Sequence, residues 1–166
     1  KAVLRRARAF GMNLLGNDIQ PIARDFLLEN QVQSVSLVDL LKNSDVVSVN
    51  CDLNPTSFHL INENTLANIK AGSVLINTAR GPIVDEKALI QALASGRLAG
   101  AALDVFEHEP LPVDSPLMKM ENVLLAPHNS NSSPSAWENV HWNTIRNLLI
   151  GLGFDPHRLT QFQKSI

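Results

Sequence analysis

The sequence has little cysteine, no excess of basic residues and no long apolar run. Cys51 is the single cysteine among 166 residues, so no intramolecular disulfide can form and no cysteine-built metal site is expected. Fourteen Lys and Arg face sixteen Asp and Glu, which gives a net charge of −2 and argues against a nucleic-acid partner. No apolar run approaches the roughly 20 residues that cross a bilayer, and no signal peptide opens the chain. We therefore expect a cytoplasmic protein that does not contact membranes.

The order of apolar and amphipathic segments predicts an α/β fold. Short β-branched runs alternate with amphipathic stretches, which is typical of a parallel sheet covered by helices on both faces. The expected strands lie at 13–17, 34–37, 46–50, 73–78, 100–105 and 123–126. The expected helices lie at 22–29, 38–41, 63–69 and 85–94, with Asp85 as the N-cap of the last one.

A final helix is predicted to begin near Ser133, with Pro134 at its first position. One side of it is expected to pack against another part of the protein, because mostly apolar residues recur there at helical spacing; this side is lined by Trp137, His141, Ile145, Leu148, Leu149 and Leu152. The periodicity fades after Gly153. The predicted organisation is one domain over residues 1–153 and a C-terminal tail over 154–166.

Polar residues follow four of the expected strands. Asp18, Arg80 and His128 come after strands, and Asp104 lies at the end of another. Ligands of doubly wound sheets bind beyond the carboxyl ends of the strands. An acid, a guanidinium, a second acid and an imidazole are therefore expected at one edge of the sheet, as in a functional site.

Asp18 and Arg80 each have two interpretations. Asp18 suits the hydroxyls of an adenosine ribose, but without context the pattern favours a solvated acid that opens a turn before Pro21. The planar guanidinium of Arg80 suits a substrate carboxylate and an adjacent carbonyl oxygen. A surface ion pair between Arg80 and Asp85 or Glu86 explains the pattern equally well.

Glu109 and His128 are the most suggestive pair. A carboxylate beside an imidazole fixes its tautomer and lets it exchange a proton near neutral pH. On spacing alone, two separate loop residues remain the simpler interpretation.

Cys51 is expected to be a small core residue and not a nucleophile, because no base accompanies it. The other histidines, at positions 59, 108, 141 and 157, lack metal-ligand spacing and are expected on the surface or in packing, so no metal site is predicted.

Three ordered blocks of the sequence resemble the D-isomer-specific 2-hydroxyacid dehydrogenases, which include phosphoglycerate dehydrogenase, glyoxylate/hydroxypyruvate reductase and the C-terminal-binding-protein corepressors. The blocks are residues 74–81 (VLINTARG), residues 101–106 (AALDVF) with Glu109-Pro110, and residues 126–128 (APH). The resemblance covers nearly all of residues 1–153 and implies a Rossmann-like domain that binds NAD. No Lys or Arg directly follows Asp18, so NAD is expected rather than NADP.

The resemblance also implies roles for single residues. Arg80 would hold the substrate carboxylate and carbonyl, His128 would donate the proton, and Glu109 would orient His128. Asp104 would bind the nicotinamide carboxamide and Asp18 the adenosine ribose, while Thr78 and Ala79 would contact the nicotinamide through backbone groups. The implied reaction is hydride exchange between NAD and a small 2-hydroxy or 2-oxo acid.

The sequence departs from the family pattern in two places. Asn129-Ser130-Asn131 follows the histidine where many relatives have two glycines, which puts the backbone contacts near the nicotinamide in doubt. The chain also begins after the position where relatives have a first strand and a G-x-G-x-x-G turn. We therefore expect an incomplete NAD-binding domain that lacks this strand and turn, binds NAD poorly and is inactive alone.

In the family's strand order the absent strand is central. Its absence is expected to separate the strands near Asn13 and Ser34 from those after Asp45. The unpaired strand edges are expected to be covered in one of two ways: by a rearranged sheet with the first visible strand beside the third, or by a homodimer that exchanges strands.

Three functions stay open at this point. The chain is part of an NAD-dependent dehydrogenase of D-2-hydroxy acids, a non-catalytic NAD-sensing or dimerisation module like the corepressors, or an α/β binding domain without redox function.

Overall fold

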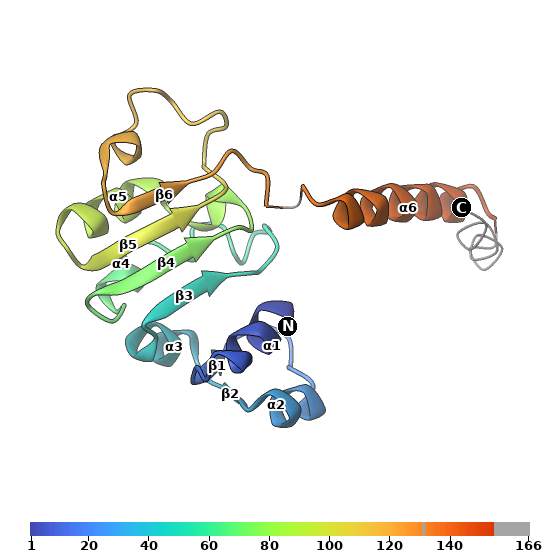
Figure 1. The fold of residues 1–166 in the computed structure, drawn as a ribbon, viewed down its shortest axis with the longest axis horizontal. Helices are drawn as coiled ribbons and strands as arrows, with labels where there is room; N and C mark the ends of the chain where they lie inside the picture. Colours follow the sequence, from blue (N-terminus) through green and yellow to red (C-terminus); the bar gives the residue numbers. More distant parts are fainter. Residues whose placement is uncertain (131, 155–166) are drawn as a thin grey trace. The chain divides into compact units, whose positions relative to one another are not determined.

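The computed structural model describes residues 1–130 and 132–154, which belong to two compact units divided between Pro127 and His128. Figure 1 shows the order of the elements along the chain. The first unit contains α1 (Ala2–Ala9), β1 (Leu14–Gly16), α2 (Arg24–Asn30), β2 (Val32–Ser34), α3 (Leu37–Asn43), β3 (Val46–Val49), α4 (Glu63–Ala67), β4 (Ser73–Asn77), the 3-10 helix η1 (Gly81–Ile83), α5 (Glu86–Ala94), β5 (Leu98–Leu103), the 3-10 helix η2 (Pro116–Lys119) and β6 (Val123–Leu125). The second unit contains α6 (Pro134–Gly151).

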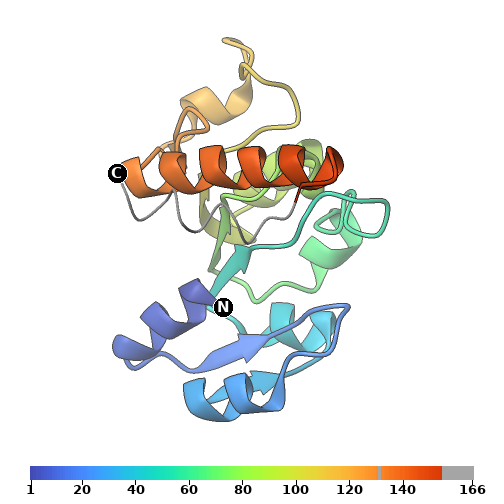
Figure 2. The same cartoon turned by 90° about the vertical axis from the view of Figure 1, so that its right-hand side faces the viewer.

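The strands form two parallel sheets, which confirms the α/β prediction. One sheet has the order β1-β2 and the other the order β3-β4-β5-β6. Successive parallel strands are joined by helices, as parallel pairing requires. In Figures 1 and 2 the two-stranded sheet lies beside the free edge of β3 without joining it.

The predicted separation of the strands near Asn13 and Ser34 from the later strands is therefore confirmed. The expected rearrangement is wrong, because β1 pairs with β2 and not with β3. Among the strands of residues 1–127, β3 pairs with β4 alone and keeps its other edge open. No strand of this unit fills the position between β1 and β3.

Local side-chain chemistry sets where the helices begin. The Ser36 hydroxyl accepts a hydrogen bond from the Asp39 N–H, so α3 begins at Leu37 and the strand predicted at 34–37 ends at Ser34. The Asp85 carboxylate accepts a 3.0 Å hydrogen bond from the Ala88 N–H, which confirms Asp85 as the N-cap of α5. Helix α1 was absent from the predicted elements and has no buried residue.

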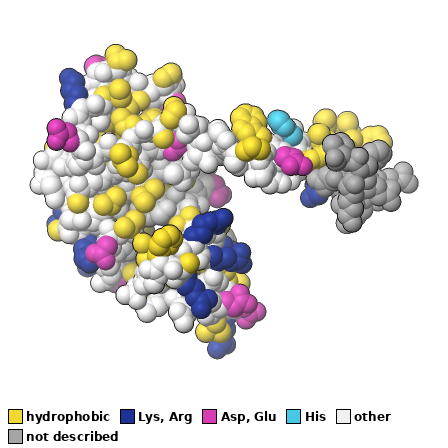
Figure 3. Space-filling model, viewed as in Figure 1, with side chains coloured by type: hydrophobic (Ala, Val, Ile, Leu, Met, Phe, Trp, Pro, Cys, Tyr) yellow, Lys and Arg dark blue, Asp and Glu magenta, His cyan; other side chains and the backbone are white. Residues whose placement is uncertain are grey.

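The main core lies between the four-stranded sheet and the helices α3, α4 and α5. Leu75 of β4 and Leu98 of β5 are fully buried, and Leu41, Leu66 and Leu89 pack on them from the three helices. The opposite face of the sheet is more open, since Val46 is 48% exposed and Leu124 is 75% exposed. Figure 3 shows apolar side chains scattered over this face. A smaller cluster joins β1, β2 and α2 through Leu14, Phe26 and Val32.

Helix α6 begins as predicted. The Ser133 hydroxyl accepts a hydrogen bond from the Ala136 N–H, and Pro134 occupies the first helical position. Within its own unit α6 has no buried residue, because that unit offers no second described element to cover it. The packing of its apolar side against another part of the protein stays a prediction. The predicted tail lies outside the described residues apart from Phe154. None of the helices described is long and apolar enough to span a membrane.

Candidate functional site

Parallel pairing places the carboxyl ends of β3, β4 and β5 side by side. Val49 pairs with Asn77, and Asn77 pairs with Leu103, so the three strands end together. The segments that follow β3 and β4 border an open cleft of about 630 Å³, a volume within the usual range for small-molecule sites. Its lining residues are Val49, Asn50, Cys51, Asp52, Leu53, Thr78, Ala79 and Arg80.

Asn77 organises the turn that carries Arg80. Its side chain is 1% exposed; the amide nitrogen donates to the Arg80 carbonyl at 3.0 Å, and the amide oxygen accepts from the Ala79 N–H at 3.0 Å. The exposed Arg80 donates to the Ala79 carbonyl at 2.6 Å. In the part of the chain that the structure describes, no ion pair joins Arg80 to Asp85 or Glu86. The guanidinium is thus held at the rim of the cleft by its own turn.

Gly81 allows the turn after β4 to pack directly on the segment after β5. A Cβ atom at Gly81 would overlap the carbonyl group of Phe106 and lie 2.6 Å from the Glu107 nitrogen. Such overlap with backbone cannot be relieved by a rotamer change, so only glycine fits. Beyond this contact, Glu109 accepts a 3.0 Å hydrogen bond from the Phe106 N–H. Asp104 is 4% exposed, and its N–H donates to the Asn77 carbonyl.

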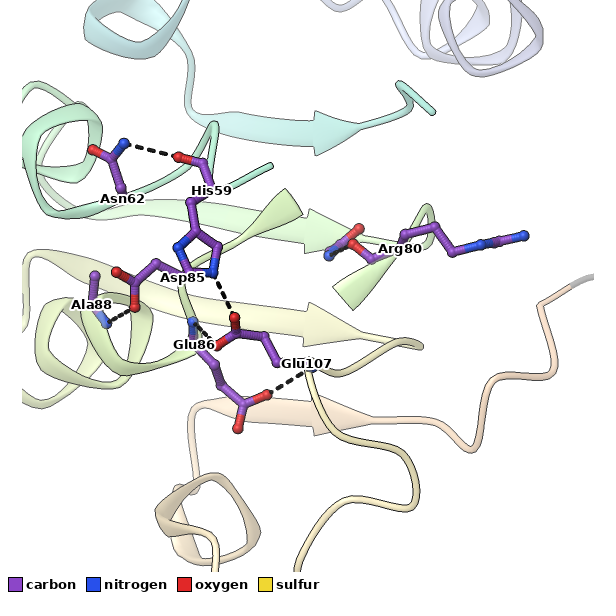
Figure 4. Close-up of polar contacts among 8 residues, drawn as sticks. His59, Asn62, Arg80, Asp85, Glu86, Ala88 and Glu107 are labelled. Carbon is purple, nitrogen blue, oxygen red and sulfur yellow. Dashed lines mark hydrogen bonds and ion pairs between the residues drawn. The ribbon is translucent and has the colours of Figure 1, made fainter. Parts of the chain in front are cut away.

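A second polar group lies behind the Arg80 turn (Figure 4). His59 Nε2 lies 2.6 Å from Glu107 Oε1, and Glu107 Oε2 accepts a 3.0 Å hydrogen bond from the Glu86 N–H. Burial raises the pKa of the Glu86 carboxyl, and the negative charge of Glu107 raises it further, against the lowering effects of a hydrogen bond from the Glu107 N–H and of His108. The prediction of His59 as a plain surface or packing residue missed this ion pair.

Acidic residues determine the electrostatics of the other side of the cleft. Partial desolvation by the neighbouring segments raises the pKa of the Cys51 thiol, and the negative charges of Asp52 and Asp18 raise it further, while a backbone hydrogen bond lowers it. Asp18, which follows β1, therefore lies close enough to act on the segment after β3, and its carboxylate accepts from the Gln20 N–H at 2.8 Å. Cys51 is exposed, so its prediction as a core residue is wrong. Its raised pKa keeps it a neutral thiol and a poor nucleophile.

The structure brings part of the predicted site together. Thr78, Ala79 and Arg80 border one cleft, while Asp104 and Glu109 lie in the neighbouring segment after β5. His128 belongs to the second unit, and its φ of 54° lies in the left-handed region that residues other than glycine rarely adopt. Among the residues described, no group of three or more His, Cys, Asp or Glu is arranged to hold a metal ion.

The contributions of Asn77, His59 and Glu107 to the site were not predicted. For Asn77 the sequence did contain a signal, because an asparagine at the end of a strand, shortly before Gly-Pro, is typical of a residue that organises a turn.

Comparison with known proteins decides the family. Residues 1–130 match the model of the D-isomer specific 2-hydroxyacid dehydrogenase, NAD binding domain. The chain belongs to this family. This match confirms the resemblance, and the family's NAD-binding domain confirms the expected cofactor at the level of the family.

Individual relatives give the extent of the likeness. The chain is 50% identical over 133 residues to the glyoxylate reductase of Korarchaeum cryptofilum, covering 80% of this chain and 40% of the relative. The glyoxylate reductase of Thermofilum pendens is 42% identical over 151 residues, 89% of this chain and 44% of the relative. The apo D-mandelate dehydrogenase of Rhodotorula graminis has a TM-score of 0.82 and 36% identity, over 89% of this chain and 43% of that one. The chain thus spans less than half the length of these relatives.

The close approach at Gly81 predicts a strong effect of a single methyl group. Gly81→Ala is expected to lower the free energy of unfolding by about 1–3 kcal/mol or more, because the Cβ overlaps the Phe106 backbone. Urea denaturation measures the change. Gly151→Ala is the matched control, since a Cβ there meets no atom within 4 Å and alanine favours the helix. Equal effects of the two substitutions would contradict the described packing.

The raised pKa of Glu86 predicts a pH-dependent stability difference. The folded state disfavours the charged carboxyl, so this penalty is absent below the unfolded pKa and appears as the pH rises through the folded pKa. Glu86→Gln is therefore expected to be more stable than the parent chain at pH 8, with the difference vanishing below about pH 4.3. Thermal melts of both proteins between these limits measure it. A variant less stable than the parent at pH 8 would refute the assignment.

Proposed function

We propose that this chain forms the NAD-binding part of an NAD-dependent oxidoreductase that interconverts a small D-2-hydroxy acid and its 2-oxo acid. The observation that carries the proposal is the cleft at the carboxyl ends of β3 and β4, with Arg80 at its rim. Membership in the dehydrogenase family and the names of the relatives support it.

The residues of the cleft fit the nicotinamide end of NAD. Its volume of about 630 Å³ suits one part of a dinucleotide, and it lies where doubly wound sheets bind their ligands. Thr78 and Ala79 line it, and we assign the nicotinamide carboxamide to the neighbourhood of these two residues and Asp104. On the β1 side, the exposed carboxylate of Asp18 suits the hydroxyls of the adenosine ribose. Because the residue after Asp18 is Ile19 and not a cation, NAD is favoured over NADP.

The protein's own residues bind and position the acid. Arg80 binds the carboxylate of the 2-oxo acid through its planar fork and polarises the adjacent carbonyl. His128 gives a proton to the carbonyl oxygen, and Glu109 acts as the carboxylate that orients it. NADH, when bound, supplies the hydride. The 166 residues contain no G-x-G-x-x-G turn for the pyrophosphate, so we propose weak NAD binding and little turnover for this chain by itself.

Turnover of glyoxylate and other 2-oxo acids tests the proposal in the natural gene product that carries these residues. NADH oxidation is expected with glyoxylate, and His128→Ala should lower kcat by about 10²- to 10⁴-fold through loss of the proton donor. Arg80→Lys should raise the KM for the acid, since an ammonium cannot bind a carboxylate bidentately. His108→Ala, at an exposed histidine without an assigned role, is the control. Full activity of the His128→Ala and Arg80→Lys variants would refute the assigned roles, and NADH binding without turnover of any acid would favour a non-catalytic module.

We also propose a cytoplasmic homodimer in which the open edges exchange a strand. The free edge of β3 and the unmatched edge of β1 support this, because unpaired strand edges favour pairing with another chain. The free thiol of Cys51 supports a reducing compartment. Multi-angle light scattering of the 166-residue chain is expected to give twice the chain mass of 18.2 kDa. A monomer at all concentrations would refute the dimer.

A further inference from the structure

His59 joins two segments that flank the Arg80 turn. Its N–H donates to the Pro82 carbonyl at 2.9 Å, so the segment after β3 runs directly along η1. The same two segments meet again at the Ile61–Val84 bridge, where the Ile61 N–H donates to the Ile83 carbonyl at 3.1 Å. The backbone of residues 59–61 therefore supports the turn that begins with Arg80.

The side chain of His59 extends this support to the segment after β5. Its Nε2 lies 2.6 Å from Glu107 Oε1, across 48 residues of sequence. The second carboxylate oxygen of Glu107 accepts from the Glu86 N–H at 3.0 Å, and the Glu107 N–H donates to Glu86 Oε2 at 3.3 Å. One carboxylate thus links the segment after β3, the start of α5 and the segment after β5.

The His59–Glu107 contact adjoins the segments of both Arg80, which we assigned to the acid substrate, and Glu109, which we assigned to orienting the proton donor. Glu107 directly follows Phe106, whose carbonyl contacts Gly81, the residue after Arg80. It precedes Glu109 by two residues, and Glu109 is bonded to the Phe106 N–H. In Figure 4 the Arg80 side chain extends away from the His59–Glu107 pair, so neither member of the pair contacts the guanidinium.

The pair is partly solvated. The side chains of His59 and Glu107 are 32% and 24% exposed, so solvent screens part of their interaction and limits its contribution to folding. Each partner's main effect is therefore local: it restricts how the Arg80 turn and the Phe106–Glu109 segment move relative to each other.

We propose that His59 and Glu107 are positioning residues that hold Arg80 in register with Glu109. The proposal rests on the proposed function for what Arg80 and Glu109 do, and on the geometry alone for how they are held. The pair acts as a strut between the two segments, and contacts neither the acid nor the nicotinamide.

Amide hydrogen exchange of the full 166-residue chain tests the strut without any turnover. His59→Ala and Glu107→Ala are each expected to accelerate exchange of the Ile61, Val84 and Glu86 amides, while the Leu75 amide in β4 keeps its parent rate. The double variant should exchange no faster than Glu107→Ala, because Glu107→Ala already removes the His59–Glu107 interaction together with the bond from the Glu86 N–H. His59→Gln, whose amide can still donate to Glu107, should restore the parent rates, and His108→Ala should match the parent. Parent rates in His59→Ala would overturn the proposal, whatever the rates of Glu107→Ala, which also removes the acceptor of the Glu86 N–H.

Kinetics of the natural gene product separate positioning from a merely structural role. His59→Ala is expected to lower kcat/KM for the 2-oxo acid about 10- to 100-fold, mainly through a higher KM for the acid, while the Kd for NADH changes less than twofold. His59→Gln should recover most of the loss. A faster-exchanging His59→Ala with parent kinetics would also overturn the proposal. Wild-type turnover is measured in the same assay, so failure of the proposed function appears as an inactive parent protein, while failure of the strut appears in the exchange rates.

Discussion

The contact between Gly81 and the Phe106 backbone is the constraint on which the rest of the site depends. Without a side chain at position 81, the turn after β4 packs on the segment after β5 at a distance that no other residue permits. This contact places Arg80 and Glu109 in neighbouring segments although 28 residues separate them in the sequence. Parallel pairing provides the framework, because β3, β4 and β5 end together and release their following segments on the same side.

Buried hydrogen bonds then fix the turn itself. Asn77 satisfies both the Ala79 N–H and the Arg80 carbonyl from a fully buried position, so these two backbone groups need no water. Behind it, Glu107 connects His59 and the start of α5. Arg80 and Ala79 border the cleft, whereas His59, Glu86 and Glu107 are not among its lining residues. A preorganised site requires a charged group that is exposed to the ligand, here Arg80, and hydrogen bonds that fix the backbone around it, here those of Asn77 and Glu107.

Features that depend on neighbouring residues were predictable from the sequence. The Asp85 and Ser133 caps, the strand at 46–50 and the placement of Arg80 and Asp104 at strand ends follow from local pattern and from the rule that ligands bind at the carboxyl ends of parallel strands. The strand at 34–37 was misplaced because Ser36 and Asp39 form a local cap that competes with the β-branched run. The His59–Glu107 pair was missed because its partners come from segments 48 residues apart. Only the fold brings them into contact, and no local spacing encodes that distance.

The open edges of β1 and β3 also could not be predicted from local sequence pattern. Periodicity identifies each strand, but pairing depends on which strands are available, and the first unit leaves one edge of each sheet free at this position. The contact between the segments after β4 and β5 is built on the β4–β5 pairing, away from the open edge of β3, whereas the cleft is lined by the segment after β3 as well.

The most direct test of this account is an NMR measurement of the Gly81 contact in the 166-residue chain. A nuclear Overhauser effect between the Hα protons of Gly81 and the amide proton of Glu107 reports the approach of the two segments. The account predicts a strong cross-peak between these protons. With both resonances assigned, absence of the cross-peak would show that the segments after β4 and β5 do not pack together, and would contradict the account.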